Sequence, residues 1–505
     1  MRFGVLAAIV LALGAAPAPA QSLDGASCER LASSLSLPNT AVTAVQPVTG
    51  GTFTPPAPGQ PLTDLPAFCR VSLTLTPSTD SDIKSELWLP LTGWNGKFQM
   101  VGNGGWGGSI QYAALAAGVK RGYATSSTDT GHVGDTAKFA LGHPEKLIDF
   151  GYRSVHETTV QSKAAIRAAY GTAPRLSYFT GCSGGGRQAF MEAQRFPEDY
   201  DAIVAGAPGY NRTDQSFQLV GQSQATQHDK ASNIPPAKLE VLHQAALKAC
   251  DGRDGVVDGL ISDPLRCTFD PEVVTCRGED GPSCLTVPQV DAAKRIYAPV
   301  LNPATGSEVF PGVEPGSEPR WRNTAGARPL GMAEELFKYV VFQDESWNFM
   351  DLEVAAHLEK ARTADGGTIS PTSANIKAFT DRGGKMIMYH GWGDTNIPPR
   401  SSVQYFDRLV QTLGAQTVNN SIRLYMAPGM GHCGGGEGPN VFDMLTPLEQ
   451  WREQGKAPAE VIASHATPEG KVDRTRPLCP YPQIAYYKGT GSIDEAQNFA
   501  CEMPR

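Results

Sequence analysis

The sequence predicts an α/β fold, a mostly parallel sheet covered by helices on both faces and divided by a large insertion. Three observations predict it. Short apolar runs alternate with helical segments up to about residue 207, the alternation then stops, and it resumes after residue 371. Such alternation is typical of parallel sheets, and 505 residues are too many for one simple core. We therefore expect residues 21–207 and 372–505 to form the core and residues 208–371 to form an inserted lid.

The expected elements follow in order. Apolar residues alternate or cluster as in strands at residues 71–75, 83–91, 97–101, 176–180, 202–205, 385–389 and 422–426. They recur at helical spacing at residues 144–170, 185–195 and 399–413. The insertion is rich in Pro and Gly, and we expect it to be irregular.

The first twenty residues have the features of a secretory signal. Arg2 precedes an apolar run at residues 5–13, and the small residues Ala18 and Ala20 follow it. A membrane anchor is the alternative, but the run is shorter than the roughly 20 residues that span a bilayer. We expect a signal at residues 1–20 and a protein that is secreted or periplasmic.

Cysteine content and net charge limit the kinds of metal site and binding partner to expect. Ten cysteines in an exported chain favour five disulfides, and zinc ligation is disfavoured because the sequence has no CxxC pair. The net charge of -8 is modest for this length, which argues against nucleic acid or an anionic membrane as the main partner. A small, neutral or weakly charged substrate fits.

The stretch GCSGG at residues 181–185 matches G-x-S-x-G between an expected strand and an expected helix. A glycine-rich connection is the alternative, but this context favours Ser183 as a nucleophile. Serine needs a base and an orienting carboxylate, which follow in the order Asp, His in such folds. Asp394 and His432 each follow an expected strand, at the sheet edge where open parallel sheets build their sites. We predict a Ser183, Asp394, His432 triad, although Asp394 as a helix cap and His432 as a loop brace are alternatives.

Two cysteines adjoin this triad. Cys182 precedes Ser183, and Cys433 follows His432. A disulfide between them would join the two catalytic loops and, by closing so long a loop, remove about 5 kcal/mol of denatured-chain entropy. We expect Cys182 to be a structural staple and not a second nucleophile.

These residues resemble the tannase and feruloyl esterase family, whose catalytic serine and histidine adjoin disulfide-bonded cysteines. The resemblance covers essentially the whole mature chain and includes GCSGGGRQ, HGWGDTNIPP, GHC, CDGRDGVVDGLISDPLRC and PGVEPGSEPRW. It implies an α/β-hydrolase core with a lid, the triad Ser183, His432 and Asp394, and hydrolysis of esters of aromatic acids.

An oxyanion hole requires two backbone N–H donors. We expect one from Gly184, the residue after the nucleophile, and the other from Gly104 or Gly105 in the turn GNGGWGG at residues 102–108. The alternative for this turn is a simple loop.

The stretch DGRDGVVDGL at residues 251–260 carries three carboxylates that can surround a hard cation. It departs from the EF-hand pattern, and a solvated acidic turn is the alternative. The resemblance implies structural calcium in the lid, bound by the side chains of Asp251, Asp254 and Asp258 and the carbonyls of Val256 and Leu260.

Cys250 and Cys267 flank this loop and are natural partners, although connectivity does not follow from counting. By order and by the resemblance, the remaining expected disulfides are Cys28–Cys69, Cys276–Cys284 and Cys479–Cys501.

Two features bear on the substrate pocket. His390 either lines an acyl pocket or braces the Asp394 loop, and we favour bracing. We expect most lid aromatics to be core and one or two to stack on an aromatic acyl group; the candidates are Phe337, Tyr339, Phe342, Trp347 and Phe349.

The leading hypothesis is a secreted serine esterase that acts on hydroxycinnamate or related aromatic esters. A tannase and a hydrolase of terephthalate monoesters are alternatives within the same resemblance, and a Ser-His-Asp peptidase is more distant. From a different class, a non-catalytic, calcium-stabilised binding protein is the alternative, but the complete triad argues against it. The sequence leaves the acyl and alcohol groups open.

Overall fold

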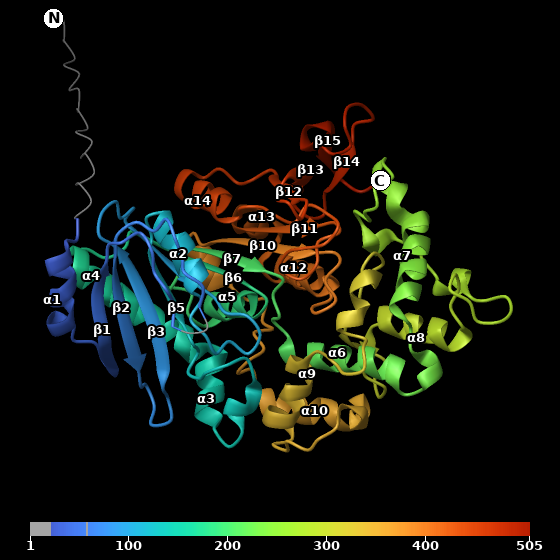
Figure 1. Cartoon of the computed structure of the whole chain (residues 1–505), viewed down its shortest axis with the longest axis horizontal. Coiled ribbons are helices and arrows are strands. Elements are labelled where there is room, and N and C mark those ends of the chain that lie inside the picture. Colours follow the sequence, from blue (N-terminus) through green and yellow to red (C-terminus); the bar gives the residue numbers. More distant parts are fainter. Residues whose placement is uncertain (1–21, 57–58) are drawn as a thin grey trace, which may run out of the picture.

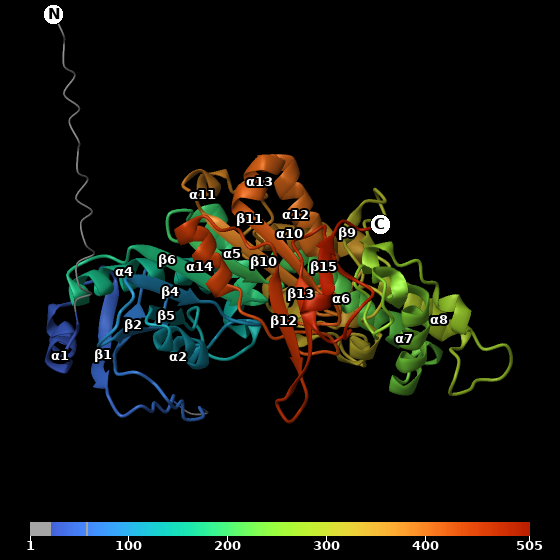
Figure 2. The ribbon, with the colours of Figure 1, turned by 90° about the horizontal axis from the view of Figure 1, so that it is seen from above.

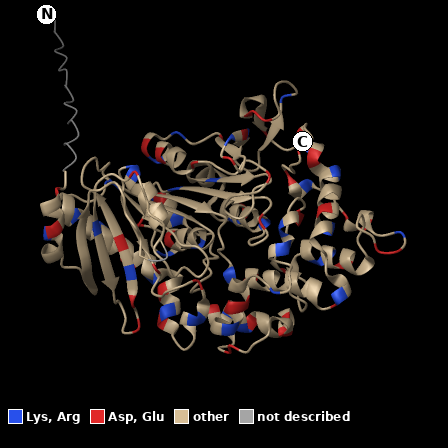
Figure 3. Cartoon of the chain, viewed as in Figure 1, with Lys and Arg blue, Asp and Glu red and all other residues tan. Residues whose placement is uncertain are grey.

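The computed structural model describes residues 22–56 and 59–505. The secretory signal expected at residues 1–20 lies outside the described residues. No helix in the described ranges has the length and apolar character needed to cross a membrane. Lys and Arg are interspersed with Asp and Glu along the lid helices and around the sheet (Figure 3).

A nine-stranded sheet forms the core, in the order β1-β2-β3-β5-β4-β6-β7-β10-β11 (Figure 1). The strands from β5 to β11 in this order are parallel, and β1, β2 and β3 form an antiparallel extension at one edge. The strands are β1 Thr40–Val48, β2 Phe68–Leu75, β3 Ile83–Pro90, β4 Lys97–Val101, β5 Ala124–Thr128, β6 Leu176–Cys182, β7 Ala202–Gly206, β10 Lys385–Gly391 and β11 Ile422–Ala427.

Helices cover both faces of the sheet, because successive strand residues point to opposite sides and both sides are apolar. Met386 and Met388 of β10 pack in the same cluster as residues of α4, α5 and α12, whereas Ile387 packs in the cluster that contains residues of α14. Residues of α2 pack against the second face near β3. The helices are α1 Gly25–Ser34, α2 Tyr112–Lys120, α3 Pro144–Ile148, α4 Ser154–Tyr170, α5 Gly184–Arg195, α11 Lys377–Asp381, α12 Arg400–Leu413, α13 Ala415–Ser421 and α14 Leu445–Gln454.

The α/β fold class is confirmed, and each expected core strand and helix has a counterpart within a few residues. The helix expected at residues 144–170 is α3 and α4 joined by a short π-helical segment at Asp149–Arg153. Two strands of the sheet, β1 and β5, and five of the helices beside it, α1, α2, α11, α13 and α14, were not expected from the sequence.

The segment between β7 and β10 builds the lid, and the prediction that it is irregular is wrong. Its helices are α6 Arg212–Gln227, α7 Pro236–Cys250, α8 Val287–Tyr297, α9 Gly331–Glu335 and α10 Val354–Asp365, with a short hairpin of β8 Val300–Leu301 and β9 Glu308–Phe310. Leu242 of α7 and Ile296 of α8 belong to a separate buried cluster. Figures 1 and 2 place α7 and α8 at the end of the molecule opposite β1.

The chain ends in two small hairpins that pack beside the lid. They consist of β12 Val461–Ala466 with β13 Val472–Leu478, and β14 Ile484–Tyr487 with β15 Phe499–Glu502. Val256, which follows α7, packs in one cluster with Ala485 and Phe499. The C-terminal hairpins therefore support the loop in which calcium is expected.

The structure pairs all ten cysteines as expected. The disulfides are Cys28–Cys69, Cys182–Cys433, Cys250–Cys267, Cys276–Cys284 and Cys479–Cys501.

Candidate active site

Ser183 occupies a strained turn between β6 and α5. Its backbone has φ 61° and ψ -118°, a conformation that is costly for a residue with a side chain. The flanking glycines make the turn possible, since a Cβ on Gly181 would lie 2.7 Å from the backbone of Gly185. This is the strand, sharp turn and helix that a G-x-S-x-G nucleophile requires.

The glycine-rich turn after β4 lies against the start of α5. A Cβ on Gly184 would come within 3.3 Å of the carbonyl oxygen of Gly105. Within the described residues, the N–H groups of Gly104 and Gly105 donate to no protein acceptor. The Gly184 backbone therefore lies beside the turn that carries Gly104 and Gly105, and the role of these glycines as oxyanion-hole donors stays a prediction.

Two side chains that were not expected from the sequence hold this turn. The carboxylate of Asp135 accepts a hydrogen bond from the N–H of Trp106, and it fills the space that a Cβ on Gly105 would need. Arg212 of α6 donates from Nη1 to the Gly105 carbonyl at 3.2 Å, and its guanidinium lies 3.9 Å from the centre of the Trp106 ring. No motif marks either residue, because both act through distant parts of the chain.

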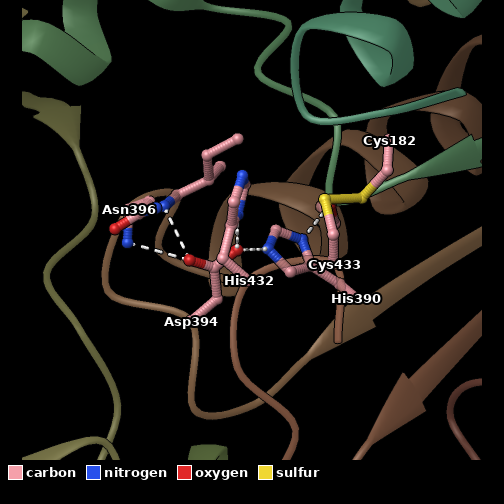
Figure 4. The surroundings of a disulfide bond; sticks show 8 residues. Cys182, His390, Asp394, Asn396, His432 and Cys433 are labelled. Carbon is pink, nitrogen blue, oxygen red and sulfur yellow. Dashed lines mark hydrogen bonds and ion pairs between the residues drawn. A yellow bond between two sulfur atoms is a disulfide. The ribbon is translucent and has the colours of Figure 1, made fainter. Parts of the chain in front are cut away.

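Asp394 is completely buried just after β10 and accepts four hydrogen bonds (Figure 4). Oδ2 accepts from His432 Nδ1 at 2.7 Å and from His390 Nε2 at 3.0 Å. Oδ1 accepts from the N–H groups of Asn396 and Ile397. Burial alone would raise the pKa of Asp394, but the charge of His432 and the hydrogen bonds from both histidines hold it below its usual value.

His432 follows β11, and its side chain is 23% exposed. Because Nδ1 bonds Asp394, Nε2 is left to act as a base. Burial lowers the pKa of His432, but the adjacent Asp394 carboxylate outweighs burial and raises it above the usual value. This arrangement fixes the ring and stabilises its charged form.

The Cys182–Cys433 disulfide brings the loops of Ser183 and His432 together. The two cysteines are 251 positions apart, yet their Cα atoms are 6.0 Å apart. The residue before Ser183 is thus bonded to the residue after His432 (Figure 4). Within the described residues no hydrogen bond joins the Ser183 hydroxyl to His432, and such bonds are often long until substrate binds.

His390 braces the Asp394 loop, and the alternative that it lines a pocket is wrong. Its side chain has no exposed surface. Nδ1 pairs with Ser402 Oγ at 2.7 Å, while Nε2 pairs with Asp394. A ring that donates from Nε2 to a carboxylate accepts at Nδ1 from the serine hydroxyl. His390 therefore links Asp394 to α12.

A cavity of about 360 Å³ adjoins His432. Arg320 and Arg322 of the lid contribute to one wall, Thr395 and Asn396 contribute to another, and the glycine-rich segment around His432 contributes to a third. The cavity therefore lies where the lid meets the loops that carry Asp394 and His432.

Arg320 reaches from the lid between these two loops. Nη2 donates to the Gly429 carbonyl at 3.2 Å and pairs with Glu437. A Cβ on Gly393 would lie 2.9 Å from Nη1, and one on Gly431 would lie 3.0 Å from Nε. Glycine at both positions makes room for the guanidinium, which connects the lid with both catalytic loops.

The five lid aromatics pack in or against one buried cluster, and none of the five lines the cavity beside His432. Phe337 and Phe349 are buried, and the ring centroids of Phe342 and Trp347 lie 5.1 Å apart. Tyr339 packs at the edge of the same cluster. The expectation that these residues are core therefore holds for Phe337 and Phe349, whereas Tyr339, Phe342 and Trp347 are partly buried against that core.

The expected calcium loop, with Val256 and Leu260, follows α7, and its three acidic side chains are buried. Asp251 accepts the N–H of Asp258. Asp254 accepts a hydrogen bond from Ser262 Oγ at 2.6 Å, and Asp258 forms an ion pair with Arg476 of β13.

The oxygen chemistry of this loop suits calcium, and its three carboxylates also bond donors of the protein itself. Burial raises the pKa of Asp254 to about 6, and the charge of Asp258 adds to this. Residues 22–56 and 59–505 contain no group of three acidic, His or Cys side chains arranged to hold a metal. Calcium stays a prediction.

Comparison with known proteins agrees with this geometry. The family model described as "Tannase and feruloyl esterase" matches residues 69–502. An uncharacterised esterase of Xanthomonas campestris pv. campestris is 38% identical over 93% of this chain and 90% of the relative. The mono(2-hydroxyethyl) terephthalate hydrolase of Piscinibacter sakaiensis is 35% identical over 87% of this chain and 85% of the relative. The crystal structure of feruloyl esterase B from Aspergillus oryzae superposes with a TM-score of 0.89 and 29% identity, covering 95% of this chain and all of that one.

Proposed function

The chain belongs to the tannase and feruloyl esterase family and is a carboxylic ester hydrolase, and on this premise we propose that Ser183, His432 and Asp394 cleave esters of aromatic acids through an acyl-enzyme. The observation that carries the proposal is the Cys182–Cys433 disulfide, which places the Ser183 turn beside a histidine already oriented by a buried carboxylate.

The first step forms the acyl-enzyme. His432 Nε2 takes the proton of the Ser183 hydroxyl while Oγ attacks the ester carbonyl. Asp394 holds the ring through Nδ1 and stabilises the imidazolium that forms. The N–H of Gly184, with that of Gly104 or Gly105, stabilises the negative oxygen of the tetrahedral intermediate. His432 then protonates the leaving alcohol.

The second step releases the acid. Water enters the position that the alcohol has left, and His432 removes its proton as the water oxygen attacks the acyl carbonyl. The tetrahedral intermediate then collapses, the bond to Ser183 Oγ breaks, and His432 returns the proton to Oγ. The net reaction consumes one water and yields one acid and one alcohol.

We propose hydroxycinnamate-type esters as the main substrates. Support comes from the similarity to a feruloyl esterase B over all of that protein's length. A terephthalate monoester is the second candidate, because the relative named as a mono(2-hydroxyethyl) terephthalate hydrolase is 35% identical. A galloyl ester is the third, and its support is the family description. The non-catalytic binding protein is set aside because the chain is an esterase.

We also propose that the protein is exported and that its lid binds calcium. Five disulfides support an oxidising compartment. Three buried carboxylates in one loop support calcium. Its role would be to hold the loop after α7 against the C-terminal hairpins, and no catalytic step depends on it.

A substrate panel tests the proposal. Methyl ferulate, methyl gallate, a terephthalate monoester and a peptide amide are compared by kcat/KM for wild type and for Ser183→Ala. We expect methyl ferulate to be the best of the four and Ser183→Ala to lose at least about 10⁴-fold in kcat. A clear preference for another ester would replace hydroxycinnamate esters as the proposed substrate class. Full activity of Ser183→Ala would reject the mechanism.

A further inference from the structure

The cavity beside His432 carries an unbalanced positive charge. Three of its lining residues have formal charges, namely Arg320, Arg322 and Glu437. Arg320 and Glu437 pair with each other. Arg322 is exposed and, within the described residues, makes no ion pair or side-chain hydrogen bond. One guanidinium is therefore left to attract an anion in this cavity.

The cavity lies on the side of the active site where the leaving alcohol is expected. In the proposed reaction His432 gives a proton to the alcohol oxygen, so the alcohol lies on the histidine side of the nucleophile. The cavity touches His432 and the two residues that follow Asp394. Within the described residues its lining includes neither Ser183 nor a glycine of the expected oxyanion hole. It thus extends away from the acyl side of the reaction.

The composition of the walls agrees with a polar occupant. Apart from Pro319, the lining consists of glycines, Thr395, Asn323, Asn396, His432 and the charged residues. No phenyl or indole ring is among the described lining residues, although an aromatic acyl group would gain from such contacts. The walls suit a hydroxylated or charged group better than an aromatic ring.

We propose that Arg322 makes this cavity a subsite for a carboxylate on the leaving alcohol, so that the preferred substrates are esters between an aromatic acid and a hydroxy acid. A guanidinium binds a carboxylate through two parallel hydrogen bonds, and a cation at the mouth of a site also raises the encounter rate with anions. This proposal rests on the esterase mechanism above and assigns Arg322 as a specificity-determining residue.

A pair of esters of equal size tests the charge alone. O-feruloyl lactate carries the carboxylate, whereas O-feruloyl lactamide replaces it with a neutral amide. Release of ferulate is measured for both esters, with methyl ferulate as a reference, for wild type, Arg322→Gln and Arg328→Gln. Arg328 is an exposed arginine of the same lid segment that does not line the cavity, so it controls for general surface charge.

We expect wild type to prefer the lactate over the lactamide by about twofold to fivefold in kcat/KM, as one exposed charge pair provides. Arg322→Gln should remove the preference by lowering kcat/KM for the lactate, Arg328→Gln should keep the preference, and added salt should reduce it in wild type. An equal preference in wild type and Arg322→Gln overturns the proposal, as does a wild type without preference. If wild type cleaves none of the three esters, the esterase mechanism itself is rejected. Failure of the subsite proposal and failure of the mechanism are therefore distinguishable.

Discussion

His432 Nδ1 lies 2.7 Å from Asp394 Oδ2, and that same oxygen also accepts a hydrogen bond from His390 Nε2. One buried carboxylate oxygen thus orients the catalytic ring while a second, fully buried ring fixes the carboxylate. His390 is in turn tied to Ser402 at the start of α12. The base is therefore held by the core of the fold and not by its own loop alone.

Replacing the carboxylate should change both the rate and its pH dependence. Asp394 raises the pKa of His432, so in Asp394→Asn that pKa falls and the acid limb of kcat/KM moves to lower pH. The maximal rate should fall by about 10³-fold to 10⁴-fold, because the amide no longer favours the required tautomer and charge. Rates measured from pH 4 to pH 9 test this. An acid limb that stays in place or moves to higher pH contradicts the assignment.

Replacing His390 should reduce kcat and leave KM nearly unchanged, because its imidazole holds Asp394 and does not reach the cavity beside His432. We expect His390→Phe to lose about tenfold in kcat, the equivalent of one buried hydrogen bond. His390→Gln, which can still donate, should recover part of the loss. Steady-state kinetics on both variants check this. A raised KM with an unchanged kcat would instead assign His390 to substrate binding.

Opening the Cys182–Cys433 disulfide should reduce activity more than its effect on folding explains. The double variant Cys182→Ser/Cys433→Ser loses up to about 5 kcal/mol of loop-closure stabilisation, so kinetics are compared at a temperature where it remains folded by circular dichroism. The matched control is Cys479→Ser/Cys501→Ser, which opens a disulfide of the C-terminal hairpins. We expect a large loss of kcat in the first and little in the second. Equal losses would mean that the catalytic disulfide has no special role.

Calcium removal should lower thermal stability and affect catalysis at 25 °C much less. If the ion binds only the folded lid, a concentration about 100 times its Kd adds about 2.7 kcal/mol to stability. Thermal unfolding in EGTA and in excess CaCl₂ measures the shift, and Asp251→Asn should reduce it. An unfolding temperature that does not respond to either reagent would show that the three carboxylates are satisfied by Arg476, Ser262 and backbone donors alone.

Local features of the active site were predictable from sequence because each depends on neighbouring residues. The Ser183 turn needs small flanking residues between a strand and a helix, and Asp394 and His432 each follow an apolar strand. The cysteines beside Ser183 and His432 further indicated which loops meet. The core strands were found for the same reason, since their apolar runs lie within a few residues.

Contacts between residues that are far apart in the sequence could not be predicted in the same way. Arg320 pairs with Glu437 across 117 positions, and Arg212 reaches Gly105 across 107. No local pattern distinguishes these arginines from others in the chain. The lid helices were missed because Pro and Gly are frequent in the connections between them, which concealed apolar positions such as Leu242 and Ile296 that become core only when α7 and α8 pack together.

The most direct test of the account is to identify the residue that carries the covalent intermediate. The unreduced protein is treated with a serine-directed fluorophosphonate, residual esterase activity is followed, and the modified peptide is located by mass spectrometry. We predict one equivalent of label on Ser183, loss of activity in proportion to labelling, and no effect of mild thiol reagents, because Cys182 is held in a disulfide. Inactivation with the label elsewhere, or a thiol reagent that inactivates the enzyme at Cys182, would contradict it.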